Sequence, residues 1–167
     1  MNRTVMLWLA VAALLSIPGA PAPTVAASQI YSLKGLQGVA VGIAELPTEI
    51  RELGLHEEDV YHAVADRLEA AGLVIRTERY AIAGEPDFLV DIFGGQFVQG
   101  IITYCINVRL EQPVIIERDR TLRTIATTWS QQFIGVVGFG TDKGVVMENI
   151  LALVDLFVDE HHSVNEP

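Results

Sequence analysis

YCINVRLE, residues 104–111, is the clearest secondary-structure signal in the chain. Its apolar residues alternate strictly with the others, which are Cys105, Asn107, Arg109 and Glu111. Alternation with a period of two predicts a β-strand that buries one face and leaves the other in contact with water. A half-buried strand of this kind is typical of an antiparallel sheet.

Further strands are predicted on both sides of this stretch. Before it, residues 88–93 form a strand, and Gly94, Gly95 and Gly100 mark a bulge or a hairpin. After it, residues 114–117 and 122–126 flank a polar turn at 118–120, which predicts a hairpin, and Pro113 indicates a break or an edge position. The second strand of the hairpin continues through TTWSQQF, and we expect one face to carry Ile125, Trp129 and Phe133.

Two amphipathic helices frame these strands. Residues 53–73 carry an apolar stripe at helical spacing, and Gly72 suits the left-handed position after the last turn. Residues 143–160 carry a broader apolar stripe, and the tail 161–167 is expected to fray. Residues 32–46 and 73–79 are predicted to be two more strands, with a turn at 83–87.

The order of elements predicts an α+β fold. We expect a two-layer sandwich in which a mostly antiparallel sheet of about five strands carries two helices on one face. This order resembles that of small periplasmic α/β modules of the bacterial envelope, such as the amino-terminal domain of TolB. The resemblance implies a binding or assembly role by analogy.

The first 27 residues are predicted to be a cleavable signal peptide. Arg3 supplies a basic start, residues 5–17 form an apolar run, and Pro18 and Gly19 end it. Small residues suit cleavage after Ala27, or nearly as well after Ala26. The run of about 13 residues is shorter than the ~20 that a spanning helix needs. We therefore expect residues 28–167 to be a single domain, periplasmic or secreted, with no stable membrane span after cleavage.

The net charge limits the kind of partner, and the cysteine content limits how the fold can be stabilised. A net charge of −10 argues against a nucleic-acid partner, which needs a basic surface. Cys105 is the only cysteine, so the exported domain has no internal disulfide and depends on its core.

Four arginines are the main candidate binding residues. Arg109, Arg118, Arg120 and Arg123 lie on the half-buried strand and the adjacent hairpin, and pairing of the two strands would place their charges on one face. Such a face would contact a phosphate, an anionic glycan or an acidic partner. The alternative is a solvated hairpin tip with Glu111, Glu117 and Asp119 as neighbours.

Catalytic and metal-binding signatures are weak. The glycines of residues 135–144 match neither the dinucleotide-binding pattern nor the P-loop, and are interpreted as a turn and helix cap. His161 and His162 are interpreted as part of a solvated tail. A hydrolase of unfamiliar type is a third hypothesis, for which Asp91, His62 and Cys105 are the residues to mutate, and we rank it last. We expect no cofactor and no metal.

The sequence therefore favours an exported, non-enzymatic binding or assembly-accessory domain of the bacterial envelope, with another envelope protein as its partner. The alternative is a periplasmic protein that binds a lipid or a small hydrophobic ligand. That alternative requires a cavity between helices and sheet, lined by residues such as Phe88, Trp129 and Phe157.

Overall fold

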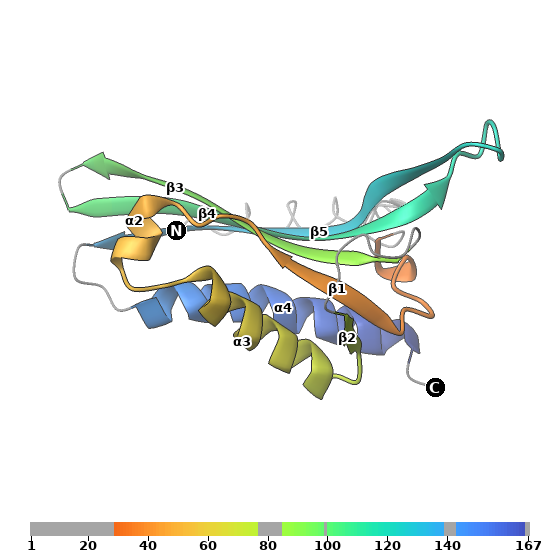
Figure 1. Ribbon diagram of the computed structural model, residues 1–167, viewed down its shortest axis with the longest axis horizontal. Coiled ribbons are helices and arrows are strands. Elements are labelled where there is room, and N and C mark those ends of the chain that lie inside the picture. Colours follow the sequence, from red (N-terminus) through yellow and green to blue (C-terminus); the bar gives the residue numbers. More distant parts are fainter. Residues whose placement is uncertain (1–28, 77–84, 99, 139–142, 166–167) are drawn as a thin grey trace, which may run out of the picture.

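The computed structural model of the 167-residue chain describes residues 29–76, 85–98, 100–138 and 143–165. The predicted leader, residues 1–27, lies outside these ranges, as do parts of the predicted 73–79 strand, of the 83–87 turn and of the glycine-rich connection. The elements are β1 (Gly38–Ile43), α2 (Thr48–Glu52), α3 (Glu57–Ala70), β2 (Val74–Arg76), β3 (Asp87–Val98), β4 (Ile101–Ile115), β5 (Arg123–Gly138) and α4 (Lys143–Asn165). Figure 1 shows the sheet as one layer and α3 and α4 as a second layer along one of its faces. The predicted α+β fold is confirmed.

The five strands form one mixed sheet in the order β2-β1-β3-β4-β5. β1 runs parallel to both β2 and β3, and α3 makes the crossover that parallel β1 and β2 require. β3, β4 and β5 pair antiparallel over long registers, so most of the sheet is antiparallel, as predicted.

The core lies between the helices and one side of the sheet. In β4 the even-numbered residues from Ile102 to Leu110 are buried, and the odd-numbered residues from Thr103 to Glu111 are half-buried. We call the side that α3 and α4 cover the helix face, and the side that carries Cys105 and Arg109 the open face. The alternation predicted for residues 104–111 is confirmed.

Helix α3 ends where its sequence predicts, but it begins later in the chain than predicted. Gly72 has a φ of 86°, and the N–H of Leu73 reaches back to the carbonyl of Leu68 over 3.1 Å. The start is Glu57 and not residue 53, because the short helix α2 and the turn at Gly54, with a φ of 85°, precede it. A helix of five residues is too short to show a periodic pattern.

The predicted first strand, residues 32–46, is too long. Only Gly38–Ile43 pairs in the sheet. Residues 29–31 are helical and turns follow them instead, with Gly35 at a φ of 77° and the N–H of Leu36 bonded to the carbonyl of Leu33 over 3.2 Å.

The prediction of a frayed, solvated carboxy-terminal tail is also wrong. Helix α4 continues to Asn165, and His161 is buried with its Nε2 2.9 Å from the carbonyl of Leu36. The Asn165 amide donates to the carbonyl of Leu33 over 2.9 Å and accepts from the N–H of Gly35 over 2.6 Å. Residues 32–36 therefore hold the last turns of α4 in place.

A bulge in β5 changes which side chains share a face. Leu110 pairs with Trp129 and Glu111 pairs with Thr127, so Thr128 is an extra residue on β5. Ile125, opposite Pro113, therefore lies on the side of the open face, whereas Trp129 lies on the helix face. The prediction that Ile125 shares a face with Trp129 and Phe133 is wrong for this reason.

Candidate functional site

A two-stranded arm projects from the sheet. Pairing between β3 and β4 ends at Asp87 and Glu111, whereas β4 and β5 stay paired as far as Ile115 and Arg123. Residues 112–126, which we call the arm, therefore extend past β3, and Figure 1 shows them rising away from the helices. Pro113 lies where β4 has lost its β3 neighbour, which confirms the predicted edge position.

The base of the arm is anchored to the body of the domain. The Gln112 side-chain amide donates to the Thr128 hydroxyl over 2.7 Å and to the carbonyl of Ser32 over 3.2 Å. The Ser32 hydroxyl donates to the carbonyl of the bulged Thr128 over 3.1 Å. These bonds tie the bulge to residues 32–36, so they fix the direction in which the arm leaves the sheet.

The tip of the arm is a closed turn. The N–H of Ile116 donates to the carbonyl of Leu122 over 3.1 Å, and the N–H of Leu122 donates to the carbonyl of Asp119 over 3.0 Å. The Asp119 carboxylate accepts the hydroxyl of Thr121 over 2.7 Å and its N–H over 3.1 Å, and these bonds hold the pKa of Asp119 below its ordinary value. The predicted hairpin is confirmed.

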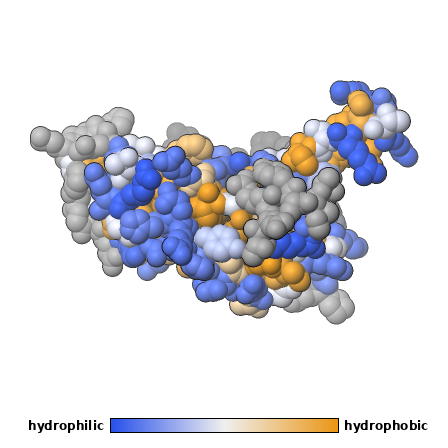
Figure 2. All heavy atoms as spheres, viewed as in Figure 1, coloured by the Kyte–Doolittle hydropathy of each residue, from blue (hydrophilic) through white to orange (hydrophobic). Residues whose placement is uncertain are grey.

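Large apolar side chains on the arm are exposed to solvent. Ile115, Leu122 and Ile125 are 56%, 49% and 50% exposed. Figure 2 shows apolar residues along the arm, with polar residues around its end. An isolated two-stranded ribbon has no core of its own, and exposed apolar clusters on soluble proteins mark interaction sites.

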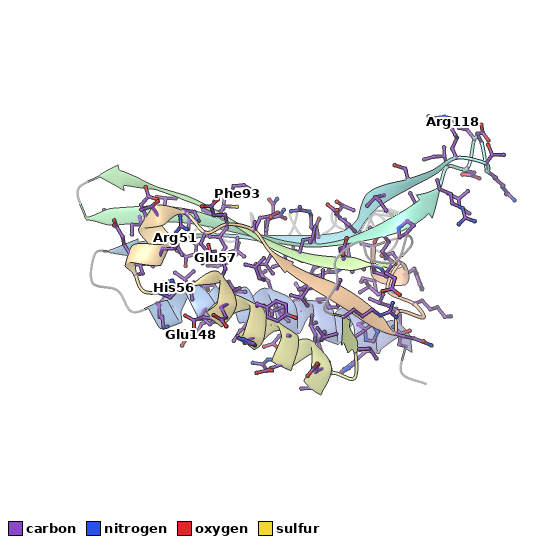
Figure 3. All side chains as sticks on the ribbon, in the orientation of Figure 1. Arg51, His56, Glu57, Phe93, Arg118 and Glu148 are labelled. Carbon is purple, nitrogen blue, oxygen red and sulfur yellow. The ribbon has the colours of Figure 1, made fainter. Side chains whose placement is uncertain are left out.

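Three of the four candidate arginines lie on this arm. Arg118 and Arg120 belong to the tip, Arg123 begins β5, and all three are exposed; Figure 3 shows Arg118 at the far end. Within the described ranges, none of the three forms an ion pair. The arm holds three arginines against two carboxylates in a chain of net charge −10, so it is the basic part of an acidic molecule.

Arg109 is separate from the other three. Its side chain lies on the open face of the sheet, where it pairs with Asp91 and, over 2.9 Å, with Glu111. Both carboxylates neutralise it, and it is only 24% exposed. The predicted arginine set therefore divides into a neutralised sheet residue and three unpaired arm residues.

Sequence reasoning missed the apolar residues of the arm. It predicted them only as strand residues of a hairpin, because alternation does not reveal whether another element covers a strand. The available signal is Pro113 followed by isoleucine, valine and leucine residues on both sides of a charged turn. A proline at an edge position indicates that the neighbouring strand has ended.

A shallow depression at the other end of the molecule is the main alternative to the arm as a binding site. It has a volume of about 450 Å³ and is lined by residues 44–48, Arg51 and residues 91–94. Figure 3 places Arg51, Glu57 and Phe93 there, far from Arg118. The Arg51 guanidinium forms ion pairs with Glu45 at 3.3 Å and with Glu57 at 3.8 Å. Its charge is therefore already balanced.

The residues proposed for a hydrolase do not meet. Asp91 and Cys105 lie on the open face of the sheet, and Asp91 is paired with Arg109. His62 lies on α3, on the other side of the sheet, and its ring nitrogen is 3.7 Å from Glu58. Among the residues that the structure describes, no three histidine, cysteine or acidic side chains come together as a metal site.

The aromatic residues suggested as the lining of a ligand cavity pack against one another. Phe157 lies edge-on to both Phe88 and Trp129, with ring centroids 4.8 and 5.0 Å apart, and all three are fully buried. These rings are core. In the part of the chain that is described, no helix is long and apolar enough to cross a membrane.

Comparison with known proteins identifies no family from which a function for the arm could be inferred. No protein-family model matches the chain, and no curated protein matches it either.

Proposed function

We propose that this chain is an exported, non-enzymatic binding domain with an assembly-accessory role in the bacterial envelope, and that it binds a partner protein through the arm. The observation that carries the proposal is the exposure of Ile115, Leu122 and Ile125 on a ribbon that leaves the sheet. Burial of such side chains against a partner favours association, because it removes apolar surface from water.

The chemistry of the arm defines the kind of partner. Arg118, Arg120 and Arg123 lie on the same arm as the apolar residues and have no carboxylate partner within the described chain. Arginine forms bidentate bonds with carboxylates and is enriched at protein interfaces. The partner is therefore expected to offer an apolar groove with acidic residues at its rim.

The leader supports an extracytoplasmic location for this activity. Residues 1–27 have the basic start, short apolar run and small-residue cleavage region of a signal peptide. An exported domain with an anchored, projecting arm suits a role in joining envelope components.

An arm-shortened variant tests the proposal. Replacing residues 113–125 with Asn-Gly links the paired residues Gln112 and Ala126 by a two-residue turn and leaves the body of the sheet unchanged. Tagged full-length chain purified from envelopes of its host is expected to recover a specific partner, and the arm-shortened variant is expected to lose it while keeping the same circular dichroism spectrum. Equal recovery by both proteins, or no specific partner for either, would contradict the proposal.

A further inference from the structure

The two edges of the sheet are protected to very different degrees. Within the described residues the edge strand β2 has three residues, and its Arg76 pairs with Glu85. The opposite edge strand, β5, has 16 residues, and residues 124–138 contain no charged residue and no proline. Natural sheets protect their edges with short strands, charges or proline. Residues 130–138 of β5 have neither charge nor proline.

The outer edge of β5 is open along its second half. The Ser32 hydroxyl donates a hydrogen bond to the backbone carbonyl of Thr128. Beyond that point, among the described residues, no strand pairs with β5 on the side away from β4. Ile134 and Val136 point to the open face and are 73% and 64% exposed. Residues 130–138 therefore present unpaired backbone groups beside exposed apolar side chains.

We infer that a second copy of this chain pairs with this edge, β5 against β5 in antiparallel orientation, and gives a two-fold dimer with a continuous sheet of ten strands. An edge strand is completed by another strand through main-chain hydrogen bonds. Two copies of a chain with a net charge of −10 repel each other over most of their surfaces, whereas β5 brings no charge to the contact after Arg123.

The short β2 edge explains why the assembly closes at two copies. A head-to-tail arrangement would pair β5 of one copy with β2 of the next, and three residues give such a contact little length. Both copies must therefore use the same edge. An interface of this type is isologous, and it is satisfied in a dimer.

The alternation of β5 favours one register. With the two-fold axis at Ile134, residues 130–138 of both copies pair over a length of about 30 Å. Ile134 then lies opposite its own copy, and Val136 lies opposite Gln132, all on the open face. Because the strands are antiparallel, the two arms project at opposite ends of the dimer.

Matched lysine substitutions test this inference. The full chain, measured by sedimentation equilibrium, is expected to have twice the mass of one chain. Ile134→Lys places like charges opposite each other at the axis and is expected to raise the dimer dissociation constant by at least about tenfold. Phe93→Lys is the control, because Phe93 is also apolar, on the open face and 61% exposed, but lies on β3, which β4 separates from the β5 edge.

Each outcome decides for or against the β5 edge. A monomeric wild-type chain at 100 µM, a dimeric Ile134→Lys chain with the wild-type dissociation constant, or equal dissociation of Ile134→Lys and Phe93→Lys would overturn the inference. If Ile134→Lys does not fold, Val136→Lys gives the same test. The inference does not depend on the arm, since the arm-shortened variant keeps residues 130–138 and is expected to remain dimeric.

Discussion

Tyr104 lies across the backbone of Gly135 on the neighbouring strand, and this contact requires glycine. The two residues are directly paired between β4 and β5, and a Cβ added at position 135 would lie 2.4 Å from the tyrosine ring. The Tyr104 hydroxyl accepts a hydrogen bond from Asn149 of α4 over 2.8 Å, so the ring cannot move without breaking that link.

Gly135→Ala is therefore expected to lower the free energy of unfolding by about 1–3 kcal/mol, the usual cost of overpacking. Chemical denaturation monitored by tryptophan fluorescence measures the loss. Gly95→Ala is the control, since an added Cβ there meets nothing within 4 Å. Equal stability of the two variants would show that the contact with Tyr104 does not constrain position 135.

Glu57 links the start of α3 to the end of the β1–α2 connection. The backbone N–H of Leu46, which donates to its carboxylate over 2.9 Å, holds the pKa of Glu57 below the ordinary value of 4.5, and the charge of Arg51 lowers it further. A lowered folded-state pKa adds stability that is fully present above the unfolded pKa and is lost as the pH falls through the folded value.

Glu57→Gln is expected to be less stable than the wild type above about pH 5 and to approach it as the pH falls below 4.5. Urea denaturation at a series of pH values measures this difference. Glu58→Gln, which removes an exposed carboxylate near His62, is expected to show a smaller effect. A Glu57→Gln deficit that does not change with pH would exclude the ionised carboxylate as its source.

At the scale of single residues, the sequence predicted which face of its strand a residue occupies and which glycine has a left-handed conformation. It did not predict which side chains pair with each other. Cys105 lies on the open face, as the parity of its strand predicts, and Gly72 has the predicted left-handed conformation. The pairing of Arg109 with Asp91 was not predictable, because it depends on which residues of β3 and β4 lie opposite each other.

At the scale of elements, the end of α4 depends on a segment more than a hundred residues earlier in the sequence. Asn165 bonds both Leu33 and Gly35, and His161 bonds Leu36. A polar, histidine-containing tail predicts fraying when it is considered alone. The helix extends because these polar groups find backbone partners in residues 32–36.

Asn165→Ala is expected to cost about 1 kcal/mol of stability, because it removes hydrogen bonds from a partly exposed site. Hydrogen exchange is the more specific measurement, and the Gly35 amide is expected to lose protection. Ser163→Ala is the control, since its hydroxyl bonds only the carbonyl of Glu160 within the same helix. Unchanged protection at Gly35 in the Asn165 variant would contradict the docking of this segment.

The bulge at Thr128 is the element-scale feature that most limited prediction of the candidate site. One extra residue reverses the face of every side chain before it in β5, so Ile125 lies on the opposite face from Trp129 and is exposed. Bulges arise from local backbone geometry and pairing register, and no residue type at position 128 marks this one.

At the scale of the whole molecule, the fold class was predictable from sequence because apolar residues repeat with one period in the strands of the sheet and with another in the helices that cover it. The strands of the antiparallel region and the two long helices were all predicted, and the structure assembles them as two layers. The parallel addition of β1 and β2 at one edge and the projection of the arm at the other were not predictable. Both depend on which strands are neighbours, and periodicity within a strand does not give that order.

The most direct test of the proposed function is site-specific photo-cross-linking from the arm in intact cells. A benzophenone amino acid at Leu122, on the arm, is compared with the same probe at Asp66, which is exposed on α3. The account predicts one heterologous adduct from position 122 that is absent from position 66 and is lost when Arg118, Arg120 and Arg123 are all changed to glutamate. Identical adducts from both positions, or no heterologous adduct from position 122, would contradict it.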